Sequence, residues 1–481
     1  MFFRIKSNFD SWGFNMNNIA TDYTSTMIKY EKQLDDAYKK SNGIFYTDLS
    51  LASKILEELD VFKFSTVLDP CCGTGSFVVA SIEKGIKNIF GADHDKNAIT
   101  ICNSYVNKAN IIVTDTIGND GVTTLKKLKT GGKVDFVIGN PPYAPLIDGI
   151  CIKASDYVFL RKVSDSGNNL FVAALLRAFE LVKQGGVISY IIPKNFLHVA
   201  SYGLLRREIL REKTIVSIID IGAYFKNVRG EQIILTIKNS APSNNFILIK
   251  KLLDNEFINM SSVEQNFFTD EILLFNSEHE FSIYKKMKSS YQILKDVCTG
   301  YVGRGRAKSN SAVTGKDIRK FGYKNIPLPE SGNRILIQNI YSAEAGIIAA
   351  LGGDLDATET VTVFTDDDEK MCHYILGILH SRLCNFFLYK FCYNNSKLTM
   401  HTDAKYLKKI PLSVKDKDNF SSIVDIVCKL EKADYMTGIW FDLLEMLNSY
   451  VYEAYGITKS EAEFIDCEMK QIQSKRWLKN G

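Results

Sequence analysis

The first half of the chain alternates between two patterns of apolar positions. Short β-branched runs predict strands, and segments with an apolar residue at every third or fourth position predict helices. Strands are expected at 65–70, 88–95, 110–116, 134–140, 185–193, 214–222 and 231–238, with helical segments between several of them. Strands that alternate with helices are joined by right-handed crossovers. The pattern therefore predicts a doubly wound, mostly parallel, seven-stranded α/β sheet.

The residues that follow the first four strands are polar or small. The first strand runs through DPCCGTG into a helix, the second ends in GADHD, the third in TD and the fourth in NPPY. Ligands of a doubly wound sheet bind at the carboxyl ends of its strands, and glycines before a helix N-terminus let a ligand approach the backbone closely. The loop matches neither GxGxxG nor GxxxxGKS/T, so a bound phosphate is not expected.

Length and composition limit the class of protein. A chain of 481 residues is too long for one compact core and suits two or three domains. It has no apolar run of roughly 18 to 20 residues and no secretory h-region, so a soluble protein of the cytoplasm is expected. The ten cysteines are scattered and include no CxxC pair, which indicates reduced thiols.

Positive charge is concentrated in one part of the chain. Residues 285–415 contain 20 Lys and Arg and 12 Asp and Glu, which gives this part a net charge of +8. The rest of the chain therefore has a net charge of −4, because the whole chain has +4. Such a surplus indicates a surface for a polyanion, although solvated helix faces give the same count.

The order DPCCGTGSF, GADHD, TD, NPPY resembles the S-adenosylmethionine-dependent amino-methyltransferases of DNA, and NPPY in this order resembles the gamma class of N6-adenine enzymes. The segment GIFYT at 43–47 is similar to an extra cofactor motif of that class. The resemblance covers about residues 41–240 and continues more faintly through the basic half. It implies a Rossmann-like catalytic domain at 41–240, preceded by a helical extension at 1–40. A bridging segment at 241–290, an α+β target-recognition domain at 291–415 and a helical segment at 416–481 would follow.

The resemblance also implies roles for residues of this chain. The side-chain oxygen of Asn140 and the carbonyl oxygen of Pro141 would accept hydrogen bonds from the two N6 protons of a flipped-out adenine. Pro142 belongs to the same catalytic segment. Tyr143 and Phe225 would stack on the base. The residues implied to bind S-adenosylmethionine are Phe45, Thr47, Asp69, Cys71, Gly73, Gly75, Asp93, Asp115 and Asn140. Those implied to bind DNA are Arg229, Arg304, Arg306, Lys308, Lys397, Lys405 and Lys408.

Each of these roles has a plainer alternative. NPPY is also compatible with a turn after a strand, and the aspartates with helix caps or surface turns. An aromatic residue at position 225 is also compatible with a core position, and 304–308 with a solvated basic hairpin. Five residues at 372–392 suggest zinc, but apolar residues fill the helical period around them and no pair has a finger spacing. We therefore expect a buried helix and no metal at Cys372, His373, His380, Cys384 and Cys392.

The function implied is a monomeric, sequence-specific adenine methyltransferase of double-stranded DNA, with a separate cognate restriction endonuclease as a further partner. Only about 40 residues precede the upstream motif, so we expect no nuclease domain and no DNA cleavage. Two alternatives stay open. One is a methyltransferase of a protein glutamine amide or of RNA adenine with the same NPPY site, and the other is an inactive DNA-binding subunit.

Overall fold

A computed structural model describes most of the chain. The described residues are 16–35, 39, 43, 45–106, 110–118, 120, 121, 123–145, 166–225, 230–290, 292–297, 300–309, 311–396, 400–402, 404–413 and 417–477. The chain divides into two compact units, the first unit Met1–Ile272 and the second unit Leu273–Gly481. Among the described residues, no helix is both long and apolar enough to cross a membrane.

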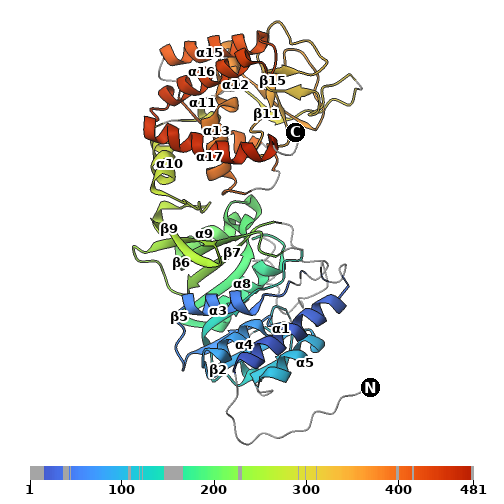
Figure 1. Ribbon diagram of the computed structural model, residues 1–481, viewed down its shortest axis with the longest axis vertical. Coiled ribbons are helices and arrows are strands. Elements are labelled where there is room, and N and C mark those ends of the chain that lie inside the picture. Colours follow the sequence, from blue (N-terminus) through green and yellow to red (C-terminus); the bar gives the residue numbers. More distant parts are fainter. Residues whose placement is uncertain are drawn as a thin grey trace, which may run out of the picture. The chain divides into compact units, whose positions relative to one another are not determined.

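A nine-stranded sheet forms the centre of the first unit (Figure 1), in the order β3-β2-β1-β4-β5-β7-β6-β8-β9. The strands from β3 to β5 pair in parallel, as do β6 and β8, whereas β7 is antiparallel to both of its neighbours and β9 to β8. This confirms the doubly wound, mostly parallel α/β sheet. Its strands are β1 (Thr66–Asp69), β2 (Asn88–Asp93), β3 (Ile111–Val113), β4 (Val134–Gly139), β5 (Val182–Pro193), β6 (Thr214–Gly222), β7 (Gln232–Lys238), β8 (Phe246–Leu253) and β9 (Glu256–Glu264).

The sheet has nine strands where the sequence predicted seven, because the expected bridging segment supplies β8 and β9. These two strands form a hairpin in which Leu253 pairs with Glu256. The turn residues Asp254 and Asn255 have φ angles of 46° and 64°. Two left-handed residues in a two-residue loop match the type I′ turn, whose twist suits a hairpin. The two lysines that interrupt the apolar run FILIKKLL concealed this strand.

Helices before, between and after the strands cover the sheet (Figure 1). Helix α3 packs against α4, and α1 packs against α5. A buried core at β1 and β2 includes Val67 and Ile89 from the strands and Leu51, Ile55 and Phe77 from the helices. Strands buried on both faces are typical of parallel sheets. The helices of the first unit are α1 (Met16–Gln33), α3 (Leu49–Glu58), α4 (Ser76–Glu83), α5 (Lys96–Tyr105), α6 (Thr123–Leu128), α8 (Leu170–Leu181) and α9 (Gly203–Glu212).

The second unit combines small sheets with helices, as the α+β expectation requires. Its largest sheet is antiparallel, in the order β11-β16-β14-β15, and β10 pairs with β17 and β12 with β13. The strands are β10 (Gln292–Ile293), β11 (Val302–Arg304), β12 (Ile318–Arg319), β13 (Gly322–Tyr323), β14 (Arg334–Gln338), β15 (Ala349–Leu351), β16 (Val361–Thr365) and β17 (Pro411–Leu412).

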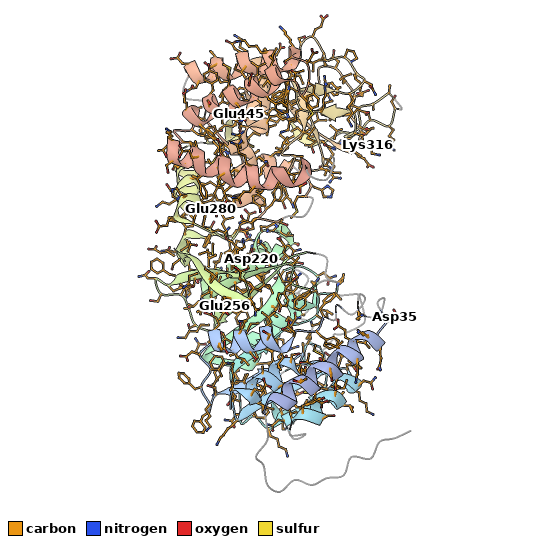
Figure 2. All side chains as sticks on the ribbon, in the orientation of Figure 1. Asp35, Asp220, Glu256, Glu280, Lys316 and Glu445 are labelled. Carbon is orange, nitrogen blue, oxygen red and sulfur yellow. The ribbon has the colours of Figure 1, made fainter. Side chains whose placement is uncertain are left out.

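Ion pairs and helix packing hold the helical part of the second unit together. Helix α15 packs against both α12 and α16. The buried ammonium of Lys390 lies 2.7 Å from a carboxylate oxygen of Glu280, labelled in Figure 2, and 2.6 Å from one of Glu468. A buried charge must be paired to be tolerated, so these contacts fix the first and last helices of the unit to its centre. The helices are α10 (Glu278–Ser290), α11 (Leu294–Val297), α12 (Glu369–His380), α13 (Arg382–Phe387), α14 (Ala404–Leu407), α15 (Lys417–Lys432), α16 (Gly438–Ala454) and α17 (Lys459–Trp477), with a π-helical turn at Leu388–Cys392.

Candidate active site and cofactor cleft

The carboxyl ends of β1 and β4 meet because the two strands are parallel neighbours, with Leu68 opposite Val137. Strand β4 ends at Gly139, which has a φ of +153°. A Cβ at this glycine would lie 2.7 Å from a carboxylate oxygen of Asp69. Gly139 therefore lets the buried carboxyl group of Asp69 lie against the start of the NPPY segment.

The amide of Asn140 is held in a fixed orientation. Its Nδ2 donates to the backbone oxygen of Phe45 at 2.9 Å and to Oγ1 of Thr47 at 3.2 Å. Both acceptors belong to the upstream motif predicted from GIFYT. Because the nitrogen is committed to these two acceptors, Oδ1 of Asn140 is available as an acceptor.

A second contact fastens the upstream motif to NPPY through the backbone. The amide of Tyr143 donates to the oxygen of Gly43 at 3.2 Å. A Cβ at Gly43, whose φ is +62°, would lie 2.5 Å from the nitrogen of Ala144. Only glycine permits such a close approach of two backbone segments. The two motifs, nearly one hundred residues apart in sequence, are thus locked together.

Tyr143 contacts Asn140 directly. Its hydroxyl lies 2.5 Å from Oδ1 of Asn140 and 2.9 Å from the backbone oxygen of Ile191, and its single proton can serve one of them at a time. Burial raises the pKa of Tyr143, so the hydroxyl keeps this proton. The ring packs at 5.9 Å from that of Phe45 and edge-to-face at 6.5 Å from that of Phe171.

Phe225, the second aromatic that we expect at the base, is half-buried and packs against the core cluster at β1 and β2. Its ring lies edge-to-face with that of Tyr224 at 5.4 Å. The hydroxyl of Tyr224 donates to Asp48 at 2.7 Å, directly after the upstream motif. Stacking of Phe225 on a base stays a prediction.

An open cleft of about 800 Å³ lies at the carboxyl ends of β1 to β4. This edge is where the ligands of a doubly wound sheet bind. Most of the residues expected at the cofactor line it, although Gly75 does not; the left-handed Gly75 caps helix α4. Of the catalytic segment, the lining includes Asn140 and Pro142. The expected residues that the structure brings together in this strand-end cleft are Phe45, Thr47, Asp69, Cys71, Gly73, Asp93, Asp115 and Asn140.

Two carboxylates hold the glycine loop in the cleft. Asp93 accepts from the backbone nitrogens of Gly73 at 2.8 Å and Asp95 at 2.9 Å, and Asp69 accepts from that of Cys71 at 3.1 Å. Burial raises the pKa of both Asp69 and Asp93, well above the ordinary range for Asp69. Asp115 accepts from the nitrogen of Gly118 at 2.9 Å. Because their pKa values are raised, Asp69 and Asp93 would ionise more easily beside a cation.

Helix α1 contributes side chains that the sequence analysis did not identify. The hydroxyl of Tyr23 lies 2.9 Å from Oγ of Ser76, and Ser76 in turn donates to the backbone oxygen of Thr47 at 2.5 Å. Tyr30 donates to Asp95 at 2.7 Å. The helix thus braces the glycine loop and the upstream motif at once. The spacing of Tyr23, Met27 and Tyr30 marks one helix face, which was the available signal.

The expected DNA-binding residues that the structure describes lie in the second unit. Arg304, Arg306 and Lys308 are exposed, on and after β11, while Gly305 between them is buried. Lys405 is exposed and Lys408 is half-buried. Arg229 and Lys397 lie outside the described residues.

Comparison with known proteins gives the family. The model of the N-6 DNA methylase family matches residues 23–296, more than half of the chain. The protein belongs to this family. It is 28% identical over 193 residues to modification methylase CviBIII of Paramecium bursaria Chlorella virus NC1A, covering 39% of this chain and 47% of that protein. It is 27% identical over 222 residues to Type II methyltransferase M.VspI of Vibrio sp. (strain 343), covering 45% and 52%.

The chain thus spans about half the length of these two curated relatives. The solved structure of the Type IIL restriction-modification enzyme MmeI in complex with DNA superposes with a TM-score of 0.53 at 11% identity. The superposed region covers 96% of this chain and 78% of the MmeI chain, so the two proteins share a fold. S-adenosylmethionine is the cofactor of this family, and the carboxyl-rich cleft fits its positive charge and ribose hydroxyls.

Binding of the cofactor should release protons. The cofactor carries a net positive charge, which favours ionised carboxylates, so the raised pKa of Asp69 should fall when the cleft is filled. A pKa that is lower in the complex means that affinity increases with pH, by up to about tenfold per pH unit for one proton released. Asp69→Asn keeps the acceptor for Cys71 and should flatten this dependence.

Calorimetry in two buffers of different ionisation enthalpy measures the number of protons released for each cofactor molecule that binds. Asp135→Asn is the matched control, because Asp135 lies on β4 outside the cleft lining and Lys183 lowers its pKa. Proton uptake instead of release, or equal release by wild type and Asp69→Asn, would show that Asp69 does not respond to the cofactor.

Proposed function

We propose that the protein is a sequence-specific DNA methyltransferase that transfers a methyl group from S-adenosylmethionine to N6 of adenine in double-stranded DNA. One observation carries the proposal: the amide of Asn140 is fixed by Phe45 and Thr47 at the edge of a cleft that suits the cofactor. Family membership supports the substrate, because the family is described as N-6 DNA methylase.

The residues of the NPPY segment would position the attacking amine. The exocyclic nitrogen of adenine is a poor nucleophile, because its lone pair is delocalised into the ring. Oδ1 of Asn140 and the carbonyl oxygen of Pro141 would accept hydrogen bonds from its two N–H groups. These bonds would reduce the delocalisation of the lone pair into the ring. Pro141 and Pro142 restrict the backbone, so that the carbonyl keeps its direction. Positioning of this kind is the main contribution that a protein makes to an in-line displacement.

The cofactor, when bound, supplies an electrophilic methyl group on a sulfonium. Attack by the amine would form the N–C bond as the S–C bond breaks, the neutral thioether S-adenosylhomocysteine would leave, and the methylated amine would lose one proton to solvent. Asp69, Asp93 and Asp115, with the backbone of Gly73, would hold the cofactor, and Phe45 and Thr47 would contact it from the other side. Cys71 lies in the same loop, and burial raises the pKa of its thiol, so it would act as a packing residue and not as a nucleophile.

The Tyr143 hydroxyl already donates a hydrogen bond to Oδ1 of Asn140. A bound base must either displace this bond or bind to the same oxygen beside it. A carboxamide oxygen has two lone pairs, so Oδ1 can accept from both the base and Tyr143, or the hydroxyl can donate to Ile191 instead. Flipping the base costs a few kcal/mol, and stacking on aromatic residues returns about 1 to 3 kcal/mol per base. Tyr143 and Phe225 are the residues proposed for this stacking.

The second unit would read the target sequence. Arg304, Arg306 and Lys308 are exposed on a segment whose backbone is fixed by a bond from Gly305 to Val361 at 2.9 Å. Arginine can bond bidentately to guanine, and lysine contacts phosphates. Lys405 and Lys408 are proposed as backbone contacts. A separate restriction endonuclease and a monomeric state belong to the same proposal.

Asn140→Ala tests the proposed chemistry. We expect transfer of labelled methyl groups to DNA to fall by at least about 10²-fold, as for the loss of one positioned hydrogen-bonding group in an active site. Cofactor affinity, measured by calorimetry, should change far less. Asn88→Ala, at an exposed asparagine at the start of β2, is the control that should keep full activity. Equal losses in both measurements would assign Asn140 a structural role only.

Changes in the 304–308 segment test the proposed DNA contact. Each phosphate contact that is lost should reduce the slope of log affinity against log salt by about 0.9. Replacing Arg304, Arg306 and Lys308 by alanine should therefore weaken binding and flatten its salt dependence, or change the methylated sequence where a base contact is lost. Lys470→Ala, at an exposed lysine of α17, is the control. Unchanged affinity and an unchanged methylation motif in the triple variant would remove this segment from the interface.

A further inference from the structure

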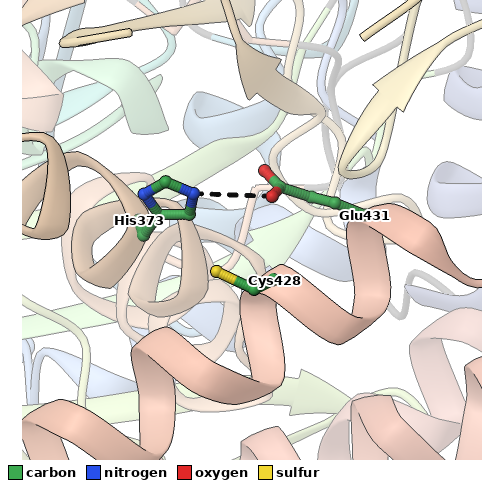
Figure 3. Close-up of side chains that lie close together, drawn as sticks. All are labelled: His373, Cys428 and Glu431. Carbon is green, nitrogen blue, oxygen red and sulfur yellow. Dashed lines mark ion pairs between the residues drawn. The ribbon is translucent and has the colours of Figure 1, made fainter. Parts of the chain in front are cut away.

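Three potential metal ligands converge between two helices of the second unit. His373 lies on α12, and Cys428 and Glu431 lie three residues apart on α15 (Figure 3). Residues three apart on a helix share a face, and α12 packs against α15. The ligand atoms of the three side chains all lie within 4.8 Å of one another. Neither the family nor the proposed methyl transfer assigns these residues a role.

The imidazole of His373 has the orientation of a metal ligand. Its Nδ1 lies 3.0 Å from the backbone oxygen of Glu369. A carbonyl oxygen can only accept, so Nδ1 carries the proton of this bond and donates it. Metal-binding histidines are usually oriented in this way by a bond from their other ring nitrogen. The Nε2 atom faces Glu431.

The carboxylate of Glu431 is buried and incompletely satisfied. Its side chain is 7% exposed, and that of His373 is 12% exposed. Oε2 of Glu431 lies 3.5 Å from Nε2 of His373, which is longer than a good hydrogen bond, and Oε1 has no hydrogen-bond partner among the described residues. A buried carboxylate oxygen without a partner is costly, and a bound cation would remove that cost.

We propose that His373, Cys428 and Glu431 bind a divalent transition metal ion of the zinc class. Imidazole, thiolate and carboxylate together match the donors that zinc takes, whereas calcium and magnesium take oxygen ligands. Bond lengths of about 2.0 to 2.3 Å at a tetrahedral ion put ligand atoms roughly 3.3 to 3.6 Å apart, so side-chain shifts of about 1 Å would close the site. With three protein ligands, a water molecule completes the coordination.

The consequence lies in the stability of the second unit and not in the methyl transfer step. The ion would join α12 to α15, and binding energy at a site that exists only in the folded chain adds to folding stability. The thiol of Cys428 is ionised when it binds, and its proton passes to solvent.

Cobalt titration of the full-length, chelator-treated protein tests the site. We expect one Co²⁺ per chain, with tetrahedral d–d absorption and a thiolate-to-cobalt charge-transfer band, both lost when Zn²⁺ is added. Cys428→Ser should abolish the charge-transfer band, and Glu431→Gln and His373→Gln should weaken metal affinity at least about tenfold. Cys467→Ser, at an exposed cysteine of α17, should leave the spectrum unchanged.

A second measurement needs no variant. In the wild-type protein, Zn²⁺ should slow alkylation of Cys428, followed by peptide mass spectrometry, and leave that of Cys467 unchanged. Circular dichroism checks that each variant is folded. Absence of a charge-transfer band, a band that survives Cys428→Ser, or alkylation of Cys428 that zinc does not slow would each overturn the site and leave His373 and Glu431 as an ion pair.

Discussion

The fixed amide of Asn140 is the contact on which the active-site arrangement depends. Two hydrogen bonds from one nitrogen, to Phe45 and Thr47, join the end of β4 to the segment before α3. They leave the oxygen of the same amide as an acceptor at the cleft. The contact depends in turn on glycines that allow close packing, since Gly43 admits the backbone of Ala144 and Gly139 admits the carboxyl group of Asp69. One polar side chain thus joins the upstream motif to the proposed base site.

The cleft is arranged for a cation that the fold alone does not need. Asp69 and Asp93 are buried enough to raise their pKa, and their bonds to the glycine loop only partly offset this. Ionisable groups with shifted pKa values are common at functional sites. A positively charged ligand can stabilise the ionised form of such a carboxyl group, which the protein alone does not. Tyr23 of helix α1 hydrogen-bonds Ser76 at the start of α4, directly after the glycine loop. The loop that this contact braces includes Cys71 and Gly73, which line the cleft.

Sequence patterns predicted what depends on local order and missed what depends on packing. Strand periodicity and the polar strand ends identified the sheet and the cleft, because parallel strands must bring their carboxyl ends to one edge. The hairpin of β8 and β9 was missed because lysines interrupt its apolar run. Tyr23 was missed because its partner Ser76 is distant in sequence. The sequence analysis looked for metal-ligand spacings only between His373 and nearby cysteines and histidines. Cys428 and Glu431 approach His373 only because α12 packs against α15. No local spacing could have revealed that set.

The first unit contains the cleft with its buried carboxyl groups, and the second unit contains the exposed residues Arg304, Arg306 and Lys308. In the first unit, we propose that the fixed carboxamide of Asn140 and the rigid carbonyl of Pro141 hold the exocyclic nitrogen of an extruded adenine. A crystal structure with a cofactor analogue and a target oligonucleotide measures this most directly. We expect adenine N6 within hydrogen-bonding distance of Oδ1 of Asn140 and of the carbonyl of Pro141. A target adenine bound elsewhere, or one whose N6 contacts neither oxygen, would contradict it.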